Sequence, residues 1–112
     1  MSFRRIIRGR ALGKDELFSA VESRTSSFTL TKDELNKSIS LTGDVTVTIP
    51  SGIFQDGDRI DFVNAGTGVI TFAGSGVTVN SVDAAVTIDT QWAGATFLFT
   101  SPSAGVLIGK LA

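Results

Sequence analysis

The sequence predicts an all-β protein: an antiparallel β-sandwich of the jelly-roll type, preceded by an extended N-terminal arm with one short helix at most. From residue 27 onward, apolar and polar residues alternate with the two-residue period of half-buried strands. Glycine- and proline-containing turns separate these runs at nearly regular spacing, as in sandwiches and barrels. A length of 112 residues suits a single domain. We expect residues 1–25 to form the arm and residues 26–112 the sandwich.

Basic residues gather at the start of the chain. The first fourteen positions hold five of the ten basic residues and no acidic one, whereas residues 15–112 carry five basic and eleven acidic side chains. This asymmetry indicates a basic arm ahead of an acidic body. Apolar residues interrupt the charges, which a purely solvated tail does not need. We therefore expect the arm to bind a protein surface through Phe3, Arg4, Arg5, Ile6, Ile7, Arg8, Arg10 and Leu12. The alternatives are a solvated terminus, or contacts with nucleic-acid phosphates, which the acidic body disfavours.

Residues 14–23 are the one stretch with a helical pattern of useful length. Leu17, Phe18 and Val21 are spaced so that they share a helix face. Further along, the sequence from Thr31 to Glu34 matches a capping box, for which we expect a single turn.

Strands are predicted wherever Val, Ile, Thr and Phe alternate or cluster in short runs. We expect residues 59–63 and 69–73 to pair as a hairpin, joined by the glycine-containing loop 64–68. A phosphate-binding loop is disfavoured there, because a strand pattern rather than a helix pattern follows the glycines. The predicted strands are residues 28–30, 39–41, 45–49, 60–62, 69–73, 77–79, 86–88, 97–100 and 106–108.

The composition argues against catalysis. The chain has no Cys and no His, so it lacks a cysteine nucleophile, a thiolate zinc site and the commonest general base near neutral pH. We predict a noncatalytic protein without a cofactor. No apolar run approaches the roughly 20 residues of a membrane-spanning helix, and no signal peptide is recognisable, so we expect synthesis in the cytoplasm.

Two groups of residues are candidate binding sites. Trp92 and Gln91 are interpreted as an oligomer interface, with stacking against a sugar ring as the alternative. Asp56, Asp58 and Asp61 form an acidic cluster next to a glycine, for which turn chemistry is the favoured interpretation. A calcium site is the alternative for these carboxylates.

One long stretch has a familiar pattern. Residues 57–72, GDRIDFVNAGTGVITF, are followed by GVTVNS at 76–81, QWAGAT at 91–96 and VLIGKLA at 106–112. Together with ISLTGDVTVTIP at 39–50, this resembles a small β-domain that recurs in structural proteins of tailed bacteriophages, including capsid decoration proteins and tail-fibre ends. The resemblance covers residues 27–112. Relatives often carry a Trp shortly before the final Val-Leu-Ile-Gly, where this chain has residues 101–105, so no role is transferred from that Trp.

The resemblance implies a noncatalytic protein of the bacteriophage virion, made late in infection. Its short length favours a capsid decoration (cement) protein that binds the assembled head across subunit junctions and stabilises it. The implied partners are the major capsid protein and copies of itself, with a homotrimer expected by analogy; a membrane is not expected as a partner, and nucleic acid is disfavoured. The alternative is a small tail or tail-fibre component that mediates host attachment.

Overall fold

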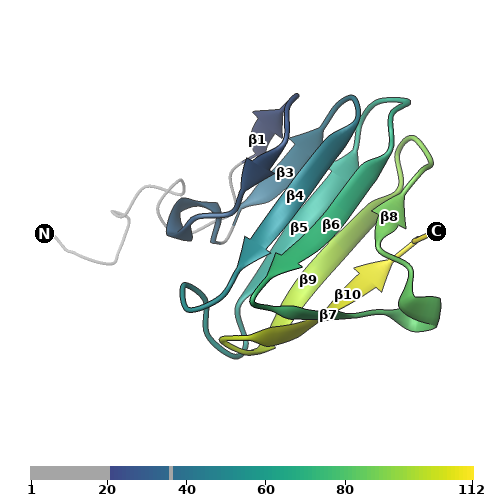
Figure 1. The fold of residues 1–112 in the computed structure, drawn as a ribbon. Helices are drawn as coiled ribbons and strands as arrows, with labels where there is room; N and C mark the ends of the chain where they lie inside the picture. Colours follow the sequence, from purple (N-terminus) through teal and green to yellow (C-terminus); the bar gives the residue numbers. More distant parts are fainter. Residues whose placement is uncertain (1–20, 36) are drawn as a thin grey trace, which may run out of the picture.

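The computed structural model describes residues 21–35 and 37–112, and its strands form two facing sheets (Figure 1). The all-β class is therefore confirmed. One sheet has the strand order β1-β3-β5-β9-β10-β7 and the other the order β2-β4-β6-β8. The strands are β1 (Val21–Arg24), β2 (Phe28–Thr29), β3 (Ser38–Leu41), β4 (Val45–Pro50), β5 (Arg59–Asn64), β6 (Ile70–Ser75), β7 (Thr78–Asn80), β8 (Thr87–Ile88), β9 (Gly94–Ser101) and β10 (Ala104–Gly109). No helix among the described residues is both long enough and apolar enough to cross a membrane.

The connectivity is that of a short β-solenoid, so the predicted antiparallel jelly roll is wrong. Successive strands from β1 to β6 alternate between the two sheets, and each of the first four, β1 to β4, pairs in parallel with the strand two places later. Val21 lies opposite Ser38, and Ser38 lies opposite Asp61. The chain thus advances by one strand of each sheet per coil. A two-residue alternation specifies a half-buried strand but not the direction of its neighbour, so it fits both topologies.

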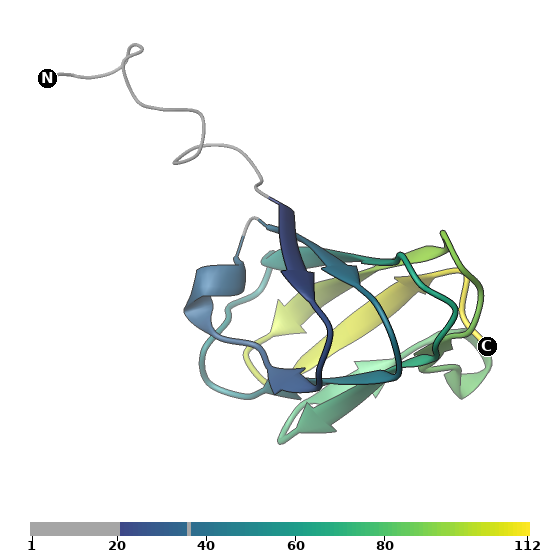
Figure 2. The same cartoon turned by 90° about the horizontal axis from the view of Figure 1, so that it is seen from above.

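The later strands close the stack with antiparallel pairs. β9 pairs with β5 and β10 pairs with β9, both antiparallel, while β8 lies antiparallel to β6 at the edge of the other sheet. β7 then adds to the outer side of β10 in parallel. Figure 2 shows the chain progressing from β1 on one side of the molecule to the C-terminus on the other.

The predicted hairpin of residues 59–63 and 69–73 is also wrong. β5 and β6 belong to different sheets, and the rings of Phe62 and Phe72 meet across the interior with centroids 4.9 Å apart. The intervening loop 64–68 is a corner, that is, a turn that carries the chain from one sheet to the other. The side chain of Asn64 holds this corner through two hydrogen bonds. Its amide nitrogen donates to the carbonyl of Gly68 at 2.9 Å, and its oxygen accepts from the backbone N–H of Gly66 at 3.2 Å.

Successive corners stack directly on one another. Ala65 N–H donates to the carbonyl of Leu41 at 2.8 Å, and Val69 N–H donates to the side chain of Asp44 at 2.9 Å. Gly68 lies so close to the backbone of the preceding corner that no side chain fits there. These contacts set the spacing between coils.

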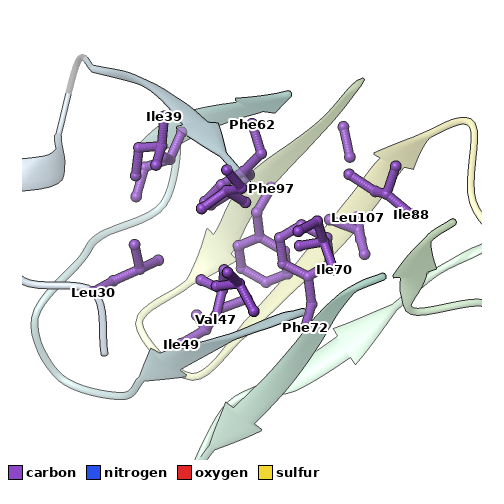
Figure 3. Close-up of a cluster of buried hydrophobic side chains, with 14 of the residues drawn as sticks. Leu30, Ile39, Val47, Ile49, Phe62, Ile70, Phe72, Ile88, Phe97 and Leu107 are labelled. Carbon is purple, nitrogen blue, oxygen red and sulfur yellow. The ribbon is translucent and has the colours of Figure 1, made fainter. Parts of the chain in front are cut away.

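The core fills the space between the sheets. Inward residues of both sheets are almost completely buried, and they point toward one another in Figure 3. Aromatic rings dominate its centre: Phe97 and Phe99 pack edge to face at 4.8 Å, and Phe54 stacks on Phe99 at the same distance. The burial pattern follows the predicted alternation along β4, β5 and β9.

The expected single turn at Thr31 is confirmed, with a complete capping box. The 3-10 helix η1 (Lys32–Glu34) begins after Thr31, whose hydroxyl accepts from Asp33 N–H, and Glu34 accepts from Thr31 N–H at 2.6 Å. The expected helix of residues 14–23 is wrong for residues 21–23, the part that the structure describes. Val21–Arg24 is strand β1, inside the range assigned to the arm, and residues 14–20 lie outside the described part.

Gly68→Ala tests the stacking of corners. An added Cβ would lie 2.3 Å from the carbonyl carbon of Gly43 and 2.4 Å from its oxygen, so the two coils must move apart. We expect a loss of about 3 kcal/mol or more in the free energy of unfolding, measured by urea denaturation followed by circular dichroism. The control Gly52→Ala has a φ of +79° but open space around it, and should lose only about 1–2 kcal/mol. Equal losses would contradict the stacking argument.

Candidate functional site

Trp92 projects from the turn that precedes β9. Its side chain belongs to a residue that is 71% exposed, which is unusual for the largest apolar side chain in the sequence. Its φ of +68° lies in the left-handed region, where a bulky residue is an outlier. Trp92 is therefore neither a core residue nor a relaxed surface residue.

The buried side chain and backbone of Asn64 hold this turn in place. Trp92 N–H donates to the carbonyl of Asn64 at 2.7 Å, and Asn64 N–H donates to the carbonyl of Ala93 at 2.9 Å. The Asn64 amide also reaches the carbonyl of Ile88 at 3.3 Å, so the turn is tied to the opposite sheet. Gln91 is exposed, and its amide donates to the carbonyl of Ala65 at 3.2 Å. The structure thus places both residues of the predicted interface on one rigid, exposed turn.

A second feature is an apolar groove on the outer face of β10. It has a volume of about 260 Å³ and runs between the end of β10 and the 3-10 helix η2 (Val82–Ala84), which lie on the same side of the molecule in Figure 1. Val82 and Ile108, which line it, are 80% and 53% exposed. Asp83 is the one charged residue in the lining.

The strained backbone of the described chain is confined to these two features. Asp83, Ala84 and Trp92 are its only non-glycine residues with a φ in the left-handed region, at 58°, 57° and 68°. Each such residue costs of order 1–3 kcal/mol, and such strain clusters at functional sites. The turn that carries Trp92 and the wall of the groove are therefore the strongest candidates for a binding surface.

Two of the three aspartates of the possible calcium site make hydrogen bonds within the fold. Asp58 accepts from the backbone N–H of Gln55 at 3.0 Å, and Asp61 accepts from the hydroxyl of Thr96 at 2.6 Å. Asp56 is exposed. Within residues 21–35 and 37–112, no three Asp, Glu, His or Cys residues are grouped so that they could hold a metal ion. The Asp58 contact is that of a turn, whereas Asp61 links the neighbouring strands β5 and β9.

Charged side chains cluster over the first coil. Glu22 is the centre of this cluster and forms ion pairs with Arg24 and with Lys37, the latter at 3.2 Å, while Arg24 also reaches the buried carboxylate of Glu34 at 3.4 Å. The Arg24 guanidinium lies 4.4 Å above the ring of Phe28. Arg24 thus covers apolar surface at the end of the stack while its charge is neutralised.

The ion pairs shift two pKa values. Burial acts to raise the pKa of Glu22, but hydrogen bonds from Arg24 and Lys37 and their positive charges outweigh it, so this pKa lies below its usual value. The hydrogen bond to Glu22 raises the pKa of Arg24. Each carboxylate of the cluster has a basic partner, which favours a structural role over acid–base chemistry.

The predicted binding residues of the arm, from Phe3 to Leu12, lie outside the described residues. Sequence reasoning missed the groove altogether. The only sequence signal for the groove is the alternation that places Val106 and Ile108 on the outward face of their strand. Nothing in the sequence indicates that Val82, more than twenty positions earlier, lies beside them.

Comparison with known proteins adds no family assignment: no family model and no curated protein matched the sequence.

The ion pairs of Glu22 predict a pH dependence of stability. A carboxylate whose pKa is lower in the folded protein than in the unfolded chain stabilises the fold above the unfolded value, about 4.5, and this stabilisation is lost as the pH falls through the folded value. Glu22→Gln should therefore reduce the loss of stability between pH 7 and pH ~3. We expect a difference of about 1 kcal/mol or less, because the pair is partly exposed.

The measurement is urea denaturation at a series of pH values. Ser23→Ala, on the same strand, removes no titrating group and is the control. A pH profile of Glu22→Gln that coincides with that of the unmodified protein would contradict the assignment.

Proposed function

We propose that the chain is a noncatalytic structural protein of a tailed-bacteriophage virion, and that it decorates and stabilises the assembled head. The major capsid protein and further copies of this chain are its partners in the proposal. The N-terminal residues 3–12 contact the head, and the β-domain is the rigid body that they attach.

The observation that carries the proposal is the separation of charge along the chain. The first fourteen residues are exclusively basic among the charged types and are interspersed with Phe3, Ile6 and Ile7, whereas residues 15–112 have six more acidic than basic side chains. A basic and apolar segment suits binding to an acidic protein surface. The acidic body of a second copy of this chain also attracts such a segment.

The mechanism is stabilisation by mass action. A protein that binds only the assembled shell lowers the free energy of that state and not of the free subunits. Contacts through several copies in one oligomer add avidity, because each further contact is intramolecular once the first has formed. Neither effect needs a catalytic group.

The structure of the described residues supports a binding role. Its core is closed, and its unusual features are exposed apolar groups and strained backbone at Trp92 and Asp83. These are properties of a surface that meets another molecule.

The second candidate function is a small tail or tail-fibre component that attaches to the host. The exposed indole of Trp92, with Gln91, Asp89 and Thr90 exposed beside it, favours this alternative, because an aromatic face flanked by polar side chains suits a sugar ring.

Deletion of residues 2–13 tests the role of the N-terminal segment. The shortened protein should keep the circular dichroism spectrum of a folded β-domain but lose attachment to purified heads, reducing co-sedimentation to background. Arg59→Gln, which removes an exposed basic residue of the body, is the control and should bind like the full chain. Full occupancy of heads by the shortened protein would overturn the proposed role.

The copy number per virion separates the two candidate functions. Quantitative mass spectrometry of purified virions should give hundreds of copies for a head decoration protein. A few to a dozen copies would instead assign the chain to the tail.

A further inference from the structure

The described chain carries both an exposed aromatic projection and an apolar depression. Trp92 is a large apolar projection held on a rigid backbone, and the groove beside η2 is an apolar depression on the same chain. Because Trp92 is 71% exposed, it does not occupy the groove of its own molecule. The projection and the depression are therefore both free on one copy.

The size of the groove indicates what kind of group it takes. Its volume of about 260 Å³ is below the roughly 300–1,000 Å³ of typical small-molecule sites, which suits insertion of a single large side chain. Exposed Val82 and Ile108 offer the apolar contact that an aromatic ring needs. Tryptophan is one of the residue types enriched at the energetic centres of protein interfaces, where such side chains fill well-packed pockets.

The groove also offers a partner for the polar atom of the indole. A buried indole N–H needs an acceptor, and Asp83 supplies a carboxylate in the groove lining. Lys110 lies between the groove residues Gly109 and Leu111, and its ammonium donates to the hydroxyl of Thr90 at 3.4 Å, so it places a positive charge beside both the groove and the Trp92 turn. Asp89 on the turn has the same sign of charge as Asp83, and the hydroxyl of Thr90 donates to it at 3.1 Å.

We propose that Trp92 of one copy inserts into the groove formed by η2 and the end of β10 on a second copy. Made reciprocally, this contact closes a two-fold dimer; made in one direction only, it is head-to-tail and builds a ring if the rotation between copies closes. A single Trp buries about 150–250 Å², whereas a stable interface needs roughly 800 Å² per partner. Trp92 is thus the centre of a larger contact to which the rims of both features contribute.

This proposal concerns self-association of the isolated protein and does not rest on the proposed place in the virion. Loss of head binding on deletion of residues 2–13 neither requires it nor removes it.

The chain contains its own reporter, because Trp92 is its only Trp and it has no Tyr. Fluorescence excited at the indole absorption edge therefore reports Trp92 alone. As the concentration of the full chain rises, emission should move to shorter wavelength while sedimentation velocity shows oligomers. Trp92→Gly, which also relieves the left-handed backbone, should sediment as a monomer. Val82→Lys should be monomeric and keep the long-wavelength emission of an exposed indole.

Mixing these two variants gives the decisive result. Trp92→Gly retains the groove and Val82→Lys retains the indole, so together they should form a one-to-one complex that cannot grow, with emission shifted to shorter wavelength. Val21→Lys is the matched control, since Val21 is 76% exposed and Val82 80%, and it should assemble like the unmodified chain.

Two outcomes overturn the proposal. One is a full chain that stays monomeric, with emission independent of concentration. The other is a mixture of variants that gives neither complex nor shift. Emission that responds to an added oligosaccharide but not to protein concentration would likewise reject self-insertion and assign Trp92 to a glycan.

Discussion

The side chain of Asn64 connects more parts of this fold than any other polar group described above. It closes the corner that carries the chain from β5 to β6, and it reaches β8 of the opposite sheet through the carbonyl of Ile88. Its backbone exchanges hydrogen bonds with the turn at Trp92 and Ala93. Since Asn64 is fully buried, each of these bonds is made away from water, where an unpaired polar group costs roughly 1–3 kcal/mol.

This arrangement explains why an exposed tryptophan can keep a strained backbone. The turn cannot relax without breaking bonds to Asn64, and Asn64 cannot move without opening the corner on which the neighbouring coil rests. The strain at Trp92 is therefore offset by the core, and the indole is presented in a fixed direction. A partner that binds it meets a preorganised group and loses little conformational freedom at this position.

The sequence predicted most of the strands, with β1 missed, but it did not predict how the strands pair. Alternation along residues 45–49 and 60–62 places the correct side chains inside, because burial on one face imposes a period of two on any sheet. Parallel and antiparallel neighbours share that period, and the unequal spacing of the coils hides the repeat that would have indicated a solenoid. The loop 64–68 has the length and glycine content of a hairpin loop. It forms a corner between the sheets instead, because the side chain of Asn64 points inward and bonds the loop backbone.

The candidate site was predictable only in part. Trp92 and Gln91 stand out by residue type, and the structure adds their exposure and backbone geometry. The groove forms where η2 lies beside β10. These elements are far apart in the chain, so no local sequence pattern predicts the groove.

The position of β7 has a consequence for how the molecule forms. Strands β1 to β6 can add coil by coil as the chain leaves the ribosome, since each pairs with one already made. β7 pairs in parallel with β10, which is synthesised later, and β9 and β10 must enter between β5 and β7. The sheet edge at β5 therefore stays unpaired in the nascent protein until β9 and β10 have been synthesised. Forming such non-local pairs is a slow step in folding. Because η2 and β10 together form the groove, the surface proposed for self-recognition comes into being only at this final closure, so unfinished chains do not display it.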